Sequence, residues 1–168
     1  MKTTIKLKAF IVASILSAVF STCCLAAEYQ ENKYKFEIEA AGVGANETFL
    51  YRIVCDTKSP QTAADDASEC AVYGVIFRGC AASAENPAQT PLLKSESLSK
   101  EQIAYFDDFF AKKQFKQYIA AVAKNNIKII KTKKGYKAEV IVSVNKRKLR
   151  RDLESAGIVD KLGKVFEN

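Results

Sequence analysis

The chain has 168 residues, 48% of them hydrophobic, contains no histidine and carries a formal net charge of +7. This length predicts one domain with a hydrophobic core, because two domains would each have too little core. The lack of histidine excludes Ser-His-Asp and Cys-His catalytic arrangements and removes the commonest zinc ligand.

Residues 1–27 have the features of a signal peptide. Three lysines form a basic start, and Ala9–Phe20 is apolar but too short to span a membrane comfortably. Small residues follow, and we expect cleavage before Ala27 or Glu28. The alternatives are a retained N-terminal anchor and lipidation of Cys23 or Cys24, although the residues before these cysteines match a lipoprotein signal poorly. The protein is therefore expected to be exported, and to be periplasmic, envelope-associated or secreted.

Residues 28–168 are expected to form a single α+β domain that begins with a β-hairpin. Apolar and polar residues alternate over Lys33–Ala40 and again over Thr48–Cys55, which is typical of strands with one buried face. Ala41–Asn46 contains two glycines and an asparagine, so we expect a turn there.

A helix packed closely on the sheet is expected next. Ser59 is the predicted N-cap, Pro60 the first helical residue, and Gly79 ends the helix just after Arg78. One side of this helix carries only small residues, so its backbone is expected to approach the sheet closely. These residues are Ala63, Ala67, Cys70, Ala71 and Gly74.

Gly79–Leu98 is expected to be a long loop, either functional or loosely ordered, with Leu92 and Leu93 holding it against the core. Ser99 and Gln102 match a capping box at the start of the following helix. The predicted inner stripe of that helix consists of Ile103, Phe106 and Phe110, flanked by Tyr105 and Phe109.

Three further strands are expected in the C-terminal half. Phe115–Ala123 alternates with the period of a strand, although a continuing alanine-rich helix is the alternative. Ile127–Lys131 and Gly135–Val144 are the next two predicted strands, separated by a tight turn. The expected architecture is therefore a two-layer α+β sandwich of a mostly antiparallel sheet with two to three helices, in the order ββα-loop-αβββα.

A short basic helix is predicted after the last strand. Asn145 is its expected N-cap, and Leu149 and Leu153 recur at helical spacing. Gly157 occupies the left-handed C′ position, from which Ile158 can contact Leu153 as in a Schellman motif. One more short helix is suggested near the C-terminus by Val159, Leu162, Val165 and Phe166.

The charge of the chain is unevenly distributed. Between Lys124 and Arg151 there are eleven basic residues and one acid, Glu139. If the last hairpin and the helix after it project to one side, they form a patch for a polyanion, an anionic lipid head group or an acidic partner. The alternative is a solvated basic face, and nucleic acid is not expected because aromatic residues are not interleaved. The candidate binding residues are Lys128, Lys131, Lys133, Lys134, Lys146, Arg147, Arg150 and Arg151.

No residue is assigned a catalytic, cofactor-binding or metal-binding role. The paired carboxylates Asp65–Asp66 and Asp107–Asp108 are adjacent, so on a helix their side chains point about 100° apart and do not converge on a substrate. The protein is therefore not expected to be an enzyme.

The cysteines that follow the signal peptide are expected to be reduced. Cys55 precedes the first helix and Cys80 follows it, so about 27 Å of helix separates them, whereas a disulfide needs Cα atoms within about 7 Å. Cys70 lies in the middle of the helix, about 15 Å along its axis from either end. No pairing within the monomer is therefore predicted.

Three segments carry structural rather than catalytic motifs: AVYGVIFRG (71–79), YFDDFF (105–110) and YKAEVIVSVNKRKLRRDLESAGI (136–158). In these segments the chain resembles a family of short secreted bacterial proteins with no assigned activity. Its arrangement of strands and helices is also similar to the small envelope-lipoprotein and flagellar-assembly T-type N-terminal domains. By analogy, the resemblance implies an envelope-associated assembly or binding role and no catalytic residue.

From these features we expect a noncatalytic, exported, envelope-associated binding or assembly module whose partner is an envelope protein or an anionic surface. The alternative is a protein that binds polyanions or anionic lipids through the basic hairpin and helix. An enzyme that works without histidine is the third possibility, and a deep pocket with converging carboxylates would favour it.

Overall fold

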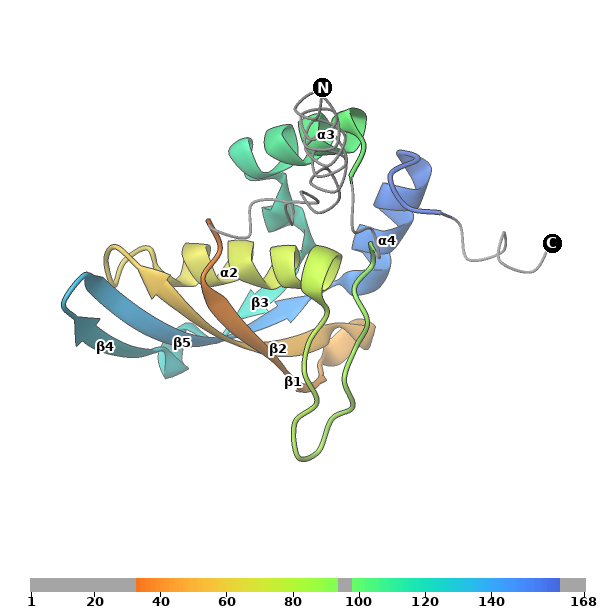
Figure 1. Cartoon of the computed structure of the whole chain (residues 1–168). Coiled ribbons are helices and arrows are strands. Elements are labelled where there is room, and N and C mark those ends of the chain that lie inside the picture. The colour runs from red at the N-terminus through yellow and green to blue at the C-terminus, as the bar shows by residue number, and fades with distance from the viewer. Residues whose placement is uncertain (1–32, 94–97, 161–168) are drawn as a thin grey trace, which may run out of the picture.

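The computed structural model describes residues 33–93 and 98–160. In this part of the chain the fold is α+β, as predicted, with a five-stranded antiparallel sheet in the order β1-β2-β5-β3 and with β4 also paired to β5 (Figure 1). The predicted signal peptide and the last three apolar residues of the predicted C-terminal helix, Leu162, Val165 and Phe166, lie outside the described residues. The strands are β1 (Phe36–Val43), β2 (Phe49–Thr57), β3 (Ile119–Val122), β4 (Lys128–Thr132) and β5 (Gly135–Val144).

The core lies between the sheet and the helix α2 (Ala63–Tyr73). β2 and β5 pair along their full lengths at the centre of the sheet, from Phe49 opposite Val144 to Thr57 opposite Tyr136. Because side chains alternate along a strand, one face of β2 and β5 is buried, and the other is more exposed and carries the charged residues. The buried face carries Tyr51, Ile53, Cys55, Ala138, Val140, Val142 and Val144, as the alternation predicts.

The opposite face of the sheet carries crossed ion pairs. Arg52 lies 3.6 Å from Glu39 on β1 and 3.7 Å from Glu139 on β5. Lys137 on β5 lies 3.7 Å from Glu37 on β1. Cross-strand pairs of opposite charge favour this strand order, although each exposed pair contributes only about 0.2–1 kcal/mol.

The helix α2 continues into a π-helical turn, η2 (Gly74–Arg78), and ends at Gly79 with φ +71°. The predicted end is therefore confirmed, whereas the α-helix begins at Ala63 rather than at Pro60. Gly74 lies directly against β1, because a Cβ at this position would be 2.7 Å from Cδ1 of Ile38. The small-residue face thus allows the close approach that the sequence predicts.

The described part of the loop after Gly79 is tied to the fold by backbone hydrogen bonds. The amides of Leu92 and Leu93 donate to the carbonyls of Val75 and Ile76 at 3.1 and 2.9 Å. Helix ends leave carbonyls without partners inside the helix, and here the loop supplies them. Both leucines are buried, which confirms that they hold the loop against the core.

The helix α3 (Lys100–Ala111) lies over α2 (Figure 1). Ser99 and Gln102 form the predicted capping box. The predicted inner stripe was partly wrong, because Ile103 is 39% exposed whereas Phe109 is 1% exposed. Aromatic rings pack α3 against η2, the end of the α2 helix: the ring centroids of Phe106 and Phe77 are 4.8 Å apart.

The segment after α3 differs from the predicted long strand. Gln114–Tyr118 is a 3-10 helix, η3, and only Ile119–Val122 forms β3. Phe115 and Tyr118 are buried, and the hydroxyl of Tyr118 donates to Asp152 at 3.0 Å. A 3-10 helix brings residues three apart to one side, so Phe115 and Tyr118 can both be buried, whereas a strand would place them on opposite faces.

The helix α4 (Lys146–Ser155) confirms the prediction for the C-terminal segment. The Asn145 side chain accepts a hydrogen bond from the Lys148 amide at 2.9 Å. At the other end Gly157 has φ +71°, and the Ile158 amide donates to the Leu153 carbonyl at 2.9 Å. These two features define a Schellman motif.

Candidate functional site

A cavity of about 830 Å³ opens at the end of the sheet where β2 ends and β5 begins. Four segments line it: Lys33–Tyr34 before β1, Asp56–Lys58 at the end of β2, one side of residues 62–70 at and within α2, and the β4–β5 turn with Tyr136. In Figure 1 this is the end of the molecule at which the β4 label lies. Its volume is within the range of small-molecule sites, about 300–1,000 Å³.

Lysines from three separate segments surround the cavity. Lys58, Lys133 and Lys134 are exposed and make no ion pair with any described residue. Lys33 differs, because its ammonium lies 3.7 Å from Glu69 and 4.8 Å from the ring centroid of Tyr34. The cavity therefore has three cationic groups that make no ion pair with a described carboxylate.

Two carboxylates of the cavity wall are held by hydroxyl groups of the protein. The Tyr34 hydroxyl donates to Glu69 at 2.6 Å, and the Thr57 hydroxyl donates to Asp66 at 2.6 Å. These short hydrogen bonds to charged acceptors fix both side chains along α2. Glu69 pairs with Lys33, whereas Asp56 and Asp66 make no ion pair with a residue of 33–93 or 98–160. Lysines therefore outnumber acids among the unpaired charges.

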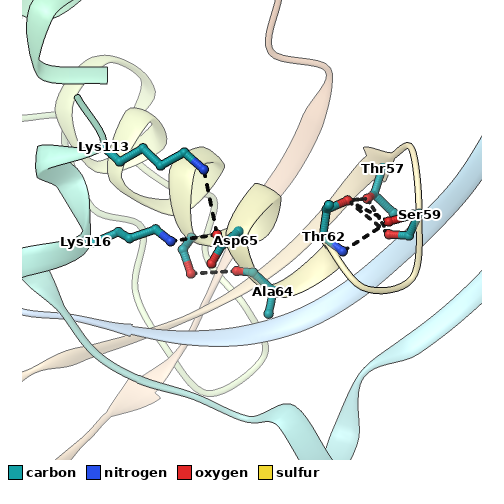
Figure 2. Close-up of polar contacts among 8 residues, drawn as sticks. Thr57, Ser59, Thr62, Ala64, Asp65, Lys113 and Lys116 are labelled. Carbon is teal, nitrogen blue, oxygen red and sulfur yellow. Dashed lines mark hydrogen bonds and ion pairs between the residues drawn. The ribbon is translucent and has the colours of Figure 1, made fainter. Parts of the chain in front are cut away.

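The polar floor of the cavity is built by the turn that starts α2. The Thr57 and Thr62 hydroxyl oxygens lie 2.9 Å apart, and the Ser59 hydroxyl accepts a hydrogen bond from the Thr62 amide at 3.3 Å. Figure 2 shows this cluster of Thr57, Ser59 and Thr62 beside the first turn of α2. Ser59 therefore caps the turn that precedes the α-helix.

A second polar contact in Figure 2 holds α2 against the segment after α3. Asp65 accepts a hydrogen bond from Lys116 at 2.6 Å, and Lys113 lies 4.0 Å away. The hydrogen bond from Lys116 lowers the pKa of the Asp65 carboxyl below its usual value. Asp65 and Asp66, adjacent in sequence, thus serve different neighbours, as expected for adjacent helical residues.

The predicted basic residues do not form one patch. Lys128, Lys131, Lys133 and Lys134 belong to the β4–β5 hairpin, and the other four candidates belong to α4. Lys131, Lys133 and Lys134 lie at the end of β5 opposite to α4, about 30 Å away along the ten residues of β5 (Figure 1). Lys128 lies between, opposite Glu139. The expectation of a joint surface is therefore corrected, and Lys133 and Lys134 instead join the cavity described above.

Two candidates on α4 make contacts within the protein. The Lys146 ammonium donates to Gln89 Oε1 at 3.1 Å and to the Thr90 carbonyl at 3.2 Å, so it ties α4 to the loop. Burial lowers the pKa of this lysine. Arg150 forms a 2.7 Å ion pair with Glu154. These contacts make Lys146 a structural residue.

The lysines Lys33 and Lys58 and the tyrosines of the cavity were missed by the sequence analysis. The sequence places these residues next to predicted strand ends. No short-range sequence pattern, however, indicates that the two strand ends and the β4–β5 turn lie side by side in the fold. The turn itself carries the signal that was available, two adjacent lysines before Gly135.

Within residues 33–93 and 98–160, no helix has the length and apolar character needed to cross a membrane. Comparisons of the chain with family models, with curated proteins and with solved structures give no match.

Proposed function

We propose that this protein is a noncatalytic, exported, envelope-associated binding module, and that the cavity at the β4–β5 turn binds the anionic group of its partner or ligand. The single observation that carries the proposal is the imbalance of charge around the cavity. The lining carries four lysines against the three acids Asp56, Asp66 and Glu69, and Lys58, Lys133 and Lys134 make no ion pair with a described residue.

The chemistry of the walls supports an anion that has an apolar body. Tyr34 and Tyr136 contribute aromatic rings, while the lysines can contact a carboxylate or a phosphate. Pockets of this kind combine an apolar wall with a few polar groups that orient the ligand. Phenyl phosphate has both features and is small enough to test the idea, with inorganic phosphate as the comparison.

The experiment is a calorimetric titration of the protein with phenyl phosphate and with inorganic phosphate. The variant K58E/K133E/K134E is expected to bind phenyl phosphate about tenfold more weakly, because three exposed ion pairs contribute on the order of 1.5 kcal/mol together. The matched control is K35E/K100E/K124E, which changes the net charge equally at exposed positions away from the cavity lining. Equal loss of binding in both variants would contradict the proposal.

The alternative function, binding of an anionic lipid surface, is favoured by one observation on β4. All five residues of β4 are exposed, and Ile129 and Ile130 are exposed by 37% and 67% between Lys128 and Lys131. Basic and apolar side chains together suit an anionic membrane surface. The test is sedimentation of the protein with phosphatidylglycerol vesicles. Loss of vesicle binding in I129S/I130S, with binding retained in K58E/K133E/K134E, would favour this alternative.

A further inference from the structure

Cys55 and Cys70 lie opposite each other between β2 and α2. The turn between them reverses the chain, so α2 runs antiparallel to the end of β2. The 2.6 Å hydrogen bond from Thr57 to Asp66 sets the alignment of the two elements. Cys70 lies four residues after Asp66, about 6 Å further along the helix axis. Cys55 lies two residues before Thr57, about 6.6 Å back along the strand. The two steps are nearly equal, so the thiols meet.

This arrangement corrects the expected separation of the two cysteines. Cys55 and Cys70 can meet only if the chain folds back after β2, and in the structure α2 does return along β2, with Thr57 bound to Asp66. The two thiols interact, and each is the largest influence on the ionisation of the other. The small side chains around Cys70 on α2, those of Ala63, Ala67 and Ala71, leave room for the helix to approach the strand.

Only one member of the pair has access to the cavity. Cys70 lines the cavity wall and is 8% exposed, whereas Cys55 is 1% exposed. Cys80, also unpaired and buried, lies past the far end of α2 and pairs through its backbone with Gln89. Cys80 is separated from Cys70 by the last three residues of α2, by η2 and by Gly79.

This interaction couples the ionisation of the two thiols. It lowers the pKa of Cys55, whose thiolate it stabilises, and with burial it raises the pKa of Cys70. The protons are therefore lost from the pair in two separate steps, and the first loss gives a thiolate that is stabilised by the remaining thiol.

We propose that Cys55 and Cys70 form a redox-active dithiol that reacts with small disulfides entering the cavity. This reaction does not depend on the anionic ligand proposed above. The pair first loses one proton, from Cys55, and the proton of Cys70 then passes to the Cys55 sulfur. The resulting Cys70 thiolate attacks one sulfur of oxidised glutathione, whose S–S bond breaks and releases one glutathione thiolate. Cys55 then loses its proton and attacks the Cys70 sulfur, which releases the second glutathione. The protein dithiol becomes a disulfide, and one glutathione disulfide is reduced to two thiols.

The test uses the full-length chain with C23S and C24S, so that three cysteines remain. The folded protein is incubated with oxidised glutathione, quenched with acid, alkylated under denaturing conditions and analysed by mass spectrometry. The expected product has lost two hydrogens, keeps one alkylated thiol at Cys80, and gives a linked peptide containing Cys55 and Cys70. C80S, as the matched control, is expected to react in the same way.

Single substitutions separate the two roles. In C55S, Cys70 is expected to keep one glutathione as a stable mixed disulfide, because its resolving partner is missing. In C70S, Cys55 is expected to stay unmodified because the cavity does not expose it. Three alkylated thiols in the parent protein after complete incubation, or a disulfide that includes Cys80, would overturn the proposal. This parent result decides the question even if a serine variant fails to fold.

Discussion

Gly79 and Gly157 allow a paired test of the backbone arguments, because both have φ +71° but different surroundings. At Gly79 an added Cβ would lie 2.2 Å from the carbonyl oxygen of Gln89 and 3.0 Å from the ring of Pro91. At Gly157 an added Cβ would have no atom within 4 Å. The same substitution to alanine therefore adds a steric conflict at one site and not at the other.

The cost at Gly79 has two parts. Its conformation, φ +71° and ψ −160°, is in a region used essentially by glycine alone, and alanine there costs about 1–3 kcal/mol. The Gln89 oxygen is a backbone atom held by the paired hydrogen bonds between Cys80 and Gln89, 2.9 and 3.0 Å long. It has no rotamer to change, so displacement adds about 1–3 kcal/mol.

Gly79→Ala is therefore expected to lower the free energy of unfolding by about 2–6 kcal/mol, and Gly157→Ala by about 1–2 kcal/mol from the left-handed backbone alone. Urea denaturation followed by far-UV circular dichroism measures both values. An equal loss in the two variants would refute the reasoning, because it would show that Gln89 moves away without cost.

Three more predictions concern the charges, the thiols and the core. Asp65→Asn should make the free energy of unfolding depend less on acid pH. The hydrogen bond from Lys116 lowers the pKa of Asp65 in the folded protein. The ionised Asp65 therefore contributes its full stabilisation above the unfolded-state pKa of 3.8, and this stabilisation is lost as the pH falls through the folded-state pKa. Urea midpoints between about pH 5 and 2 test this, and parallel curves would contradict it. Oxidation of Cys55 and Cys70 closes a loop of about 15 residues and should add about 3 kcal/mol to the free energy of unfolding, measured with and without reductant. Phe106→Ala removes a fully buried ring and should cost about 3–5 kcal/mol in the same assay; a cost under about 1 kcal/mol would show that the aromatic contacts are not tightly packed.

Local signals predicted the C-terminal strand and helix well. The alternation over Gly135–Val144 appears in the structure as a strand with one buried face, and both ends of α4 are capped as expected. Such features depend on residues within a few positions of each other. The capping box at Ser99 and the end of the α2–η2 helix at Gly79 were predictable for the same reason.

The errors arose where a neighbour distant in sequence decides the outcome. Periodicity alone could not show that α3 would turn Phe109 inward and leave Ile103 exposed, because the face of a helix is chosen by what packs against it. The 3-10 turn η3 depends in the same way on Tyr118, whose hydroxyl is bound by Asp152 of α4. Both cases need the tertiary arrangement.

The cavity was the least predictable feature. Its three unpaired lysines come from the end of β2 and from the turn before β5, and they meet because those strands pair with Thr57 opposite Tyr136. The predicted joint patch failed for the same geometric reason, since β5 carries the hairpin at one end and α4 at the other. Charge counting found the right turn, Lys133–Lys134, but not its partners.

The pairing of β2 with β5 also determines when the protein can fold. Thr48 and Ser143, whose hydroxyl groups lie 2.9 Å apart, are 95 residues apart in the chain. Contacts of such long range close a large loop before they contribute any pairing energy, and chains rich in them fold slowly. During biosynthesis, β2 lacks its central neighbour until residue 144 has been made, and its unpaired edge can meanwhile associate with other chains. Refolding yield is therefore expected to fall as the protein concentration rises.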